Sequence, residues 1–181
     1  MEEIRRPVIE HTQPLAAFSG DMLELSEQYL DCFVALDVKS HTDRIHPSYF
    51  LIHHSTELAL KAFLAYRGLS YRKIVEFNHK IRSSYVKSIE SGLIAIPKLD
   101  FLVDRISDMN VEHSLRYPAY KFTSVPDAEE CAEVVRALIS IIGPDIRTAA
   151  TISMLKLRAR YPGCDFVWVG DPEPLAAKHR N

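Results

Sequence analysis

Apolar residues recur every three or four positions along most of this chain, which is the period of an amphipathic α-helix. The first run extends from Leu15 to about Lys39, and Pro14 is placed to open it, because the missing proline N–H costs nothing at a helix start. A second helix is predicted from about Ser48 to Tyr66. It is apolar on nearly every side, which is typical of a central, buried helix.

Shorter helical segments follow. A third helix is predicted over 78–91, with Asn78 as its N-cap, and a fourth over 98–109. Asp127 can cap a last long helix, which Gly143-Pro144 should break or kink before a further helical piece to about residue 160. The fold class predicted from this pattern is all-α, an up-and-down bundle of about five helices with an irregular C-terminal tail.

The predicted domain organisation is simple. Residues 1–13 are polar and form an N-terminal arm, residues 14–161 form the helical bundle, and residues 162–181 form a C-terminal tail rich in proline and glycine. Within the tail, residues 166–169 fit either a short strand or an extended lid over the core. The chain has too little alternating pattern for a convincing sheet.

Composition excludes several classes of protein. The 181 residues carry a formal net charge of −2, so no global basic field exists and binding to duplex DNA is not expected. The three cysteines are widely spaced and form no Cys-x-x-Cys pair, which favours a cytoplasmic protein without a zinc knuckle. No signal peptide and no uninterrupted apolar span of membrane length is present, so no membrane association is expected.

Polar side chains interrupt the second helix on one face. His54, Glu57 and Lys61 are spaced three and four residues apart, and Glu57 and Lys61 are in the favourable order for an ion pair. Two interpretations stay open. These residues satisfy each other or a neighbouring helix, or they line a polar pocket in which Lys61 meets a phosphate near His79.

A metal site is the less favoured interpretation of the same histidines. His53 and Glu57 have the spacing of two ligands on one helical turn, and His54 and His79 are nearby candidates. However, the chain lacks a His-Glu-x-x-His motif and no third ligand is indicated. We therefore expect no metal and no cofactor.

The stretch from Pro47 to Gly68, followed by Asn78-His79-Lys80-Ile81, resembles the HEPN family. Members typically carry Glu-Leu-x-Leu-Lys-Ala on one helix, as Glu57 to Ala62 does here, and then Gly-His-Asp-Leu. Only the histidine of that second motif is retained. Arg116-Tyr117-Pro118 is similar to an Arg-Tyr-Pro signature of some branches. The resemblance covers about residues 15–160.

The resemblance implies a helical bundle that often forms homodimers and is associated with nucleotides or RNA. One branch contains metal-independent ribonucleases with an Arg-x(4–6)-His motif, in which arginine stabilises phosphorane-like charge and histidine moves protons. Arg72 and His79 have that spacing, but roughly two such pairs arise by chance in this composition. The pair also precedes the third helix, whereas the active branch carries its motif near the last one.

Three hypotheses result. The first is a non-catalytic HEPN-like module that binds a nucleotide or RNA, with Glu57, Lys61, His79 and Arg116 as its ligand-binding residues. The second is a metal-independent ribonuclease of the toxin or antiviral type, with Arg72 and His79 as the candidate catalytic pair. The third is a homodimeric interaction scaffold in which the polar cluster is structural. For the Arg116 loop, packing against the bundle is the alternative to ligand binding.

Overall fold

The computed structural model describes residues 6–37, 44–110, 115 and 125–175. These residues form, in chain order, β1 (Val8–His11), α1 (Leu15–Ala35), α2 (Ile45–Tyr66), α3 (Tyr71–Glu76), α4 (Ile81–Glu90), α5 (Leu99–Met109), α6 (Ala128–Arg160) and β2 (Asp165–Trp168). The predicted all-α bundle is confirmed, with six helices in the described part of the chain rather than five.

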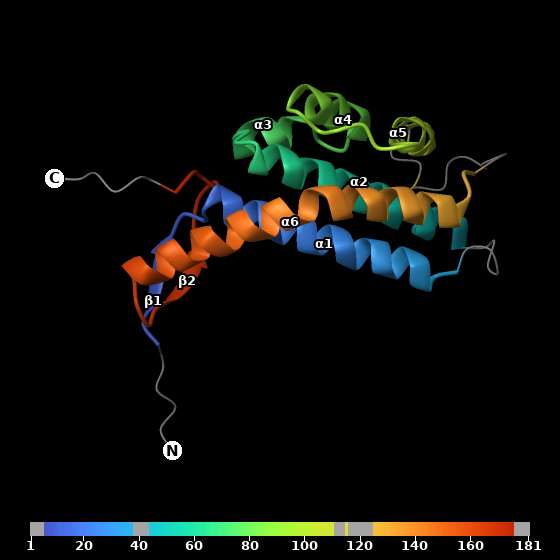
Figure 1. The fold of residues 1–181 in the computed structure, drawn as a ribbon. Coiled ribbons are helices and arrows are strands. Elements are labelled where there is room, and N and C mark those ends of the chain that lie inside the picture. The colour runs from blue at the N-terminus through green and yellow to red at the C-terminus, as the bar shows by residue number, and fades with distance from the viewer. Residues whose placement is uncertain (1–5, 38–43, 111–114, 116–124, 176–181) are drawn as a thin grey trace, which may run out of the picture.

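The long helix α2 lies at the centre of the bundle. It contacts α1 and α6 on one side and α3, α4 and α5 on the other (Figure 1). Ile52, Leu60 and Leu64 of α2 are completely buried. The nearly uniform apolar character of this segment is thus explained, because a central helix has neighbours on most of its circumference.

Small residues bring α1 close to its neighbours. Ser26 Oγ donates to the Ser55 carbonyl and Ser55 Oγ donates to the Ser26 carbonyl, each over 2.8 Å. Further along α1, a Cβ atom added at Gly20 would lie 2.7 Å from Ala150 Cβ of α6. The absence of a side chain at Gly20 therefore permits the close crossing of α1 and α6.

Of the break or kink predicted at Gly143-Pro144, the break is wrong, because α6 continues through these residues to Arg160. Ile142 and Ile146, on either side of Pro144, are both buried in the core. Their packing holds the backbone helical despite the hydrogen bond that proline loses, since tertiary contacts override local propensity. Pro144 itself is exposed.

The segment between α2 and α4 also differs from the prediction. The short helix α3 was not predicted, and α4 begins at Ile81 rather than Asn78. Asn78 adopts a left-handed conformation with φ 48°, which asparagine tolerates better than most residues, so it lies in a turn and not at an N-cap. At α6 the predicted cap is confirmed, as the Asp127 side chain accepts from Glu130 N–H over 3.0 Å.

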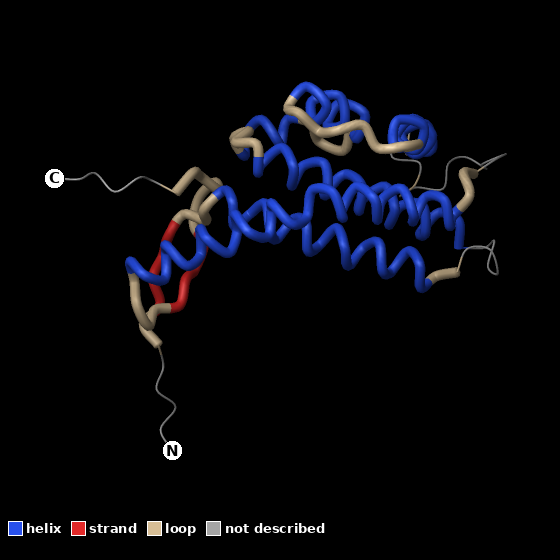
Figure 2. Tube along the Cα trace, viewed as in Figure 1, coloured by secondary structure: helices blue, strands red, loops and turns tan. Residues whose placement is uncertain are grey.

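The arm and the tail form a small parallel sheet, which the sequence did not predict. Val8 pairs with Asp165 and His11 with Trp168, and both strands lie beside the C-terminal half of α6 (Figure 2). His11 and Phe166 form an edge-to-face cluster with Tyr161 at the end of α6. The 166–169 segment is therefore a strand over most of its length, and β1 is the partner that local patterning could not identify.

One described helix, α6, is long and apolar enough to cross a membrane by length and composition. Val135, Leu138 and Ile142 of this helix are buried in the core of the bundle. The packing of α6 against α1 and α2 buries 33% of its most apolar segment.

Candidate functional site

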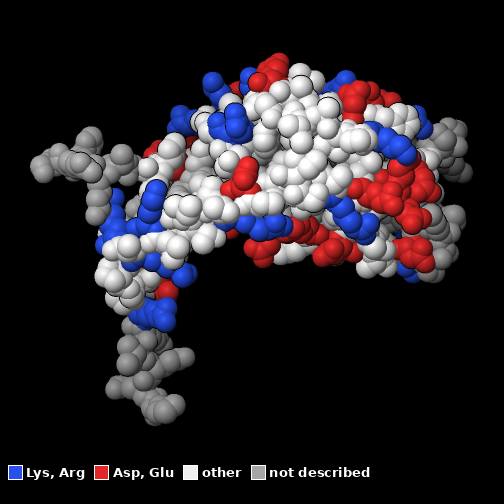
Figure 3. Space-filling view, in the orientation of Figure 1, with Lys and Arg blue, Asp and Glu red and all other residues white. Residues whose placement is uncertain are grey.

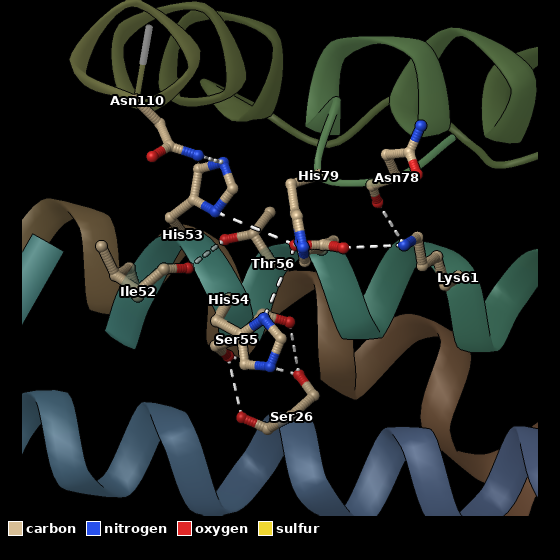
Figure 4. A network of polar contacts seen from close by, with 11 residues as sticks. Ser26, Ile52, His53, His54, Ser55, Thr56, Lys61, Asn78, His79 and Asn110 are labelled. Carbon is tan, nitrogen blue, oxygen red and sulfur yellow. Dashed lines mark hydrogen bonds and ion pairs between the residues drawn. The ribbon is translucent and has the colours of Figure 1, made fainter. Parts of the chain in front are cut away.

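A buried carboxylate on α2 is the centre of the polar cluster. The Glu57 side chain is 3% exposed. Its Oε1 accepts from Lys61 Nζ over 2.7 Å, and its Oε2 lies 3.2 Å from His79 Nδ1 and 3.5 Å from His54 Nδ1. Figure 4 shows His54 and Lys61 of α2 and His79 of the α3–α4 connection lying close together in this network.

The α3–α4 connection brings His79 and a backbone carbonyl to the cluster. The left-handed turn at Asn78 precedes His79, and the Asn78 carbonyl accepts from Lys61 Nζ over 2.5 Å. Lys61 thus donates to the Glu57 carboxylate on its own helix and to the Asn78 carbonyl in the turn between α3 and α4. The spacing of Glu57 and Lys61 places them on one face of α2, so this ion pair follows directly from the sequence.

The network extends to α5 through His53. His53 Nδ1 is 4.0 Å from Glu57 Oε2, and His53 Nε2 is 3.1 Å from Asn110 Nδ2, at the C-terminal end of α5. The His53 side chain is only 3% exposed. Polar groups from α2, the α3–α4 turn and the end of α5 therefore meet inside the bundle.

The partners of Glu57 determine its charge. Burial on its own raises the pKa of this carboxyl, but the adjacent His54 ring, the hydrogen bonds from Lys61 and His79 and the charge of Lys61 together outweigh it and lower the pKa to about 2. Glu57 is therefore ionised at neutral pH. Its charge is compensated in place, as a buried charge requires.

The structure brings together three of the predicted site residues. Glu57, Lys61 and His79 form one network, in which the Lys61 side chain is 12% exposed and the His79 side chain 36%. Arg72 does not join it, since its side chain is 86% exposed and pairs with Asp171 over 3.2 Å. Arg116 lies outside the described residues.

The geometry of the network favours a structural role over a ligand pocket. Lys61 donates to an acceptor on each side, Glu57 Oε1 and the Asn78 carbonyl, so its ammonium group is already engaged within the fold. No group of three His, Cys, Asp or Glu side chains with a metal-binding arrangement occurs among the described residues. His53, His54 and His79 instead all face the Glu57 carboxylate.

A second region, not predicted as a site, lies where the end of α6 meets β2. A groove of about 410 Å³ opens between α1, the C-terminal half of α6 and β2. Trp168 forms part of its wall, is 37% exposed, and stacks on Phe166 with ring centres 5.7 Å apart and an interplanar angle of 3°. The groove residues are Gln13, Ala17, Asp21, Ala150, Thr151, Met154, Leu155, Arg158 and Trp168.

Basic side chains gather at the same end of the molecule. Lys156, Arg158 and Arg160 are exposed on the last turns of α6, and Arg160 lies over the Tyr161 ring at 5.6 Å. Figure 3 shows Lys and Arg prevailing there, whereas Asp and Glu gather at the other end of the bundle. In the sequence, this region is indicated by three basic residues, Lys156, Arg158 and Arg160, followed by the aromatic residues Tyr161, Phe166 and Trp168. This signal is overlooked when the tail is interpreted as irregular.

Comparison with protein families identifies one match. The HEPN domain model matches residues 25–146, which include the Glu57–Lys61 helix and His79. No curated protein and no solved structure matches the chain. The residues that line the groove at β2 all lie outside this range, because Gln13, Ala17 and Asp21 precede it and the others follow it. Because the matched segment exceeds half of its length, the chain belongs to the HEPN domain family.

Proposed function

We propose that this HEPN domain binds single-stranded RNA without cleaving it, through the groove between the end of α6 and β2. The observation that carries the proposal is the position of Trp168 and Arg158 on the walls of one open groove. Its volume of about 410 Å³ falls within the roughly 300–1,000 Å³ typical of small-ligand sites. A base can stack on an exposed aromatic ring there while the phosphates lie near the arginine.

Charge supports the proposal. Single-stranded nucleic acid is held by a positively charged surface next to aromatic platforms. The end of α6 supplies three cations, Lys156, Arg158 and Arg160, against the roughly half-unit negative charge of a helix C-terminus. Asp165 and Asp171 are paired with Arg6 and Arg72, and Asp21, the acid that lines the groove, accepts a hydrogen bond from Gln13. The three exposed cations at the end of α6 therefore outnumber the groove carboxylate, although the whole chain is slightly acidic.

The polar cluster of α2 has a different role in this proposal. Lys61 is bonded to Glu57 and to the Asn78 carbonyl, so binding a phosphate would require it to exchange these partners. We infer that the cluster fixes α2, the α3–α4 turn and α5 relative to one another. For the ribonuclease alternative, Arg72 pairs with Asp171 while His79 bonds Glu57, so the two candidate catalytic groups are engaged with different partners.

The single tryptophan of the chain makes the proposal directly testable. Titration with a short single-stranded oligoribonucleotide should quench Trp168 emission, and log Kd should change with log salt by roughly 0.7 per phosphate contacted. Arg158→Met should weaken binding and reduce the salt slope by about that amount. Lys87→Met, which changes a half-buried lysine of α4 that pairs with Glu90, is the matched control and should leave both unchanged.

Three outcomes count against the proposal. If emission and anisotropy of a labelled oligonucleotide stay constant, the domain does not bind this ligand. If the oligonucleotide binds but Trp168 emission is unchanged, the groove is not the site. If the oligonucleotide is shortened in EDTA, and His79→Ala abolishes the cleavage, the metal-independent ribonuclease hypothesis replaces this one.

A further inference from the structure

The outer edge of β1 has backbone groups that β2 does not use. Asp165 N–H donates to the Pro7 carbonyl over 2.9 Å, and Val169 N–H donates to the His11 carbonyl over 3.1 Å. With the observed parallel register, the odd-numbered residues of β1 therefore face β2. The N–H and C=O groups of the alternate residues, Val8 and Glu10, point away from it.

This edge is a candidate for pairing with another strand. A sheet of two short strands is marginal in water and is stabilised by additional strands. Unpaired strand edges are templates for another chain unless they are covered or blocked. Here Val8 is 63% exposed and Pro7 and Glu10 are also exposed, so the edge faces solvent.

The charges along the edge indicate which partner fits. Arg6, Val8 and Glu10 alternate along β1 and are all exposed on one face. When two copies of this segment run antiparallel about a two-fold axis at Val8, each Arg6 lies opposite the Glu10 of the other copy. The segment is therefore complementary in charge to itself, and the only intramolecular ion pair of Arg6 among the described residues is a long 3.9 Å contact with Asp165.

We propose that two copies of this chain associate through β1, forming a continuous four-stranded sheet in the order β2–β1–β1–β2. Val8 pairs with Val8 on the axis and exchanges both backbone hydrogen bonds, and the two Arg6–Glu10 pairs flank it. Pro7 does not interfere, because the N–H that proline lacks would face β2 and not the new neighbour. This is an isologous contact, as a two-fold dimer requires.

The contact is short, so the dimer is expected to be weak. Each copy contributes only a few residues, and interfaces well below roughly 1,000 Å² support transient association. Sedimentation equilibrium of the full chain over a range of micromolar concentrations should therefore show a reversible monomer–dimer equilibrium.

Charge reversal gives the sharpest test. Arg6→Glu or Glu10→Arg alone places like charges opposite each other twice per dimer and should raise Kd roughly tenfold or more. Mixing the two variants should restore association as a heterodimer, because all four charges are then opposite in sign across the interface. The double variant Arg6→Glu/Glu10→Arg should also recover. Lys87→Glu on α4 is the control and should not alter Kd.

A backbone variant tests the hydrogen bonds independently of charge. Val8→Pro removes an N–H that points away from β2, so circular dichroism and thermal unfolding should match wild type while dimerisation is lost. The proposal is overturned if wild type stays monomeric, or if a dimer forms that neither charge reversal nor Val8→Pro weakens. RNA binding at the groove can persist in either case, so this result and the proposed function can fail separately.

Discussion

Replacing Glu57 by glutamine removes the charge at the centre of the α2 network while keeping the shape of the side chain. The pKa of Glu57 is about 2, against an ordinary value of 4.5. Each pKa unit corresponds to about 1.36 kcal/mol, so the folded state favours the ionised form by about 3 kcal/mol. Glu57→Gln should therefore lower the free energy of unfolding at pH 7 by about 3 kcal/mol, close to the loss expected when one partner of a buried ion pair is removed.

The pH dependence has a definite sign. A carboxyl whose pKa is lowered by folding contributes stability above its unfolded pKa of 4.5, and this contribution is lost as the pH falls toward about 2. The stability difference between wild type and Glu57→Gln should thus be fully present at pH 6–7 and should shrink between pH 4.5 and pH 2. Glutamine does not titrate, so the variant lacks this component of the profile.

Urea unfolding followed by circular dichroism measures both effects. Glu90→Gln is the matched control, because Glu90 pairs with Lys87 at the surface and its side chain is 57% exposed. It should change the unfolding free energy by less than about 0.5 kcal/mol. If Glu57→Gln costs no more than this control at pH 7, or if its cost does not change with pH, the network does not stabilise the fold as described.

Two further predictions concern the contacts of α1. Gly20→Val should destabilise the protein by about 2 kcal/mol, because the added Cβ would lie 2.7 Å from Ala150 Cβ and overpacking costs roughly 1–3 kcal/mol; an unchanged urea midpoint would contradict the close crossing. Ser26→Ala should cost about 1 kcal/mol through the lost bond to the Ser55 carbonyl. If thermal unfolding is unaffected by it, that hydrogen bond contributes nothing net.

Periodicity predicted the long helices well. Leu15 begins α1 and Tyr66 ends α2, as the apolar spacing indicated, and Asp127 caps α6 because its side chain can reach an N–H that the helix leaves free. These features depend on neighbours within a few residues along the chain. They are therefore readable from one sequence without any knowledge of tertiary contacts.

Features that depend on distant contacts were not predicted. Pro144 is accommodated because Ile142 and Ile146 pack against other helices, which local propensity does not include. The strand at Val8 is stabilised by Asp165 and its neighbours at the other end of the chain, so neither half shows its pairing alone. Asn78 was a reasonable N-cap by type, but the turn that carries His79 to Glu57 places it in a left-handed conformation.

The candidate site was predicted in part. The spacing of Glu57 and Lys61 placed them together, and His79 joins them as expected. Whether they form a pocket or a structural network depends on burial, which the sequence does not contain. The groove at Trp168 was missed because it is formed by α1, α6 and β2 together.

One comparison tests the central claim most directly, namely that the groove and not the α2 network binds RNA. Arg158→Met and Lys61→Met remove one cation each, and binding of a labelled single-stranded oligoribonucleotide to each folded variant is measured by anisotropy. The account predicts that Arg158→Met weakens binding several-fold while Lys61→Met lowers thermal stability but leaves the Kd of the folded protein unchanged. Loss of binding in Lys61→Met with full binding in Arg158→Met would contradict it.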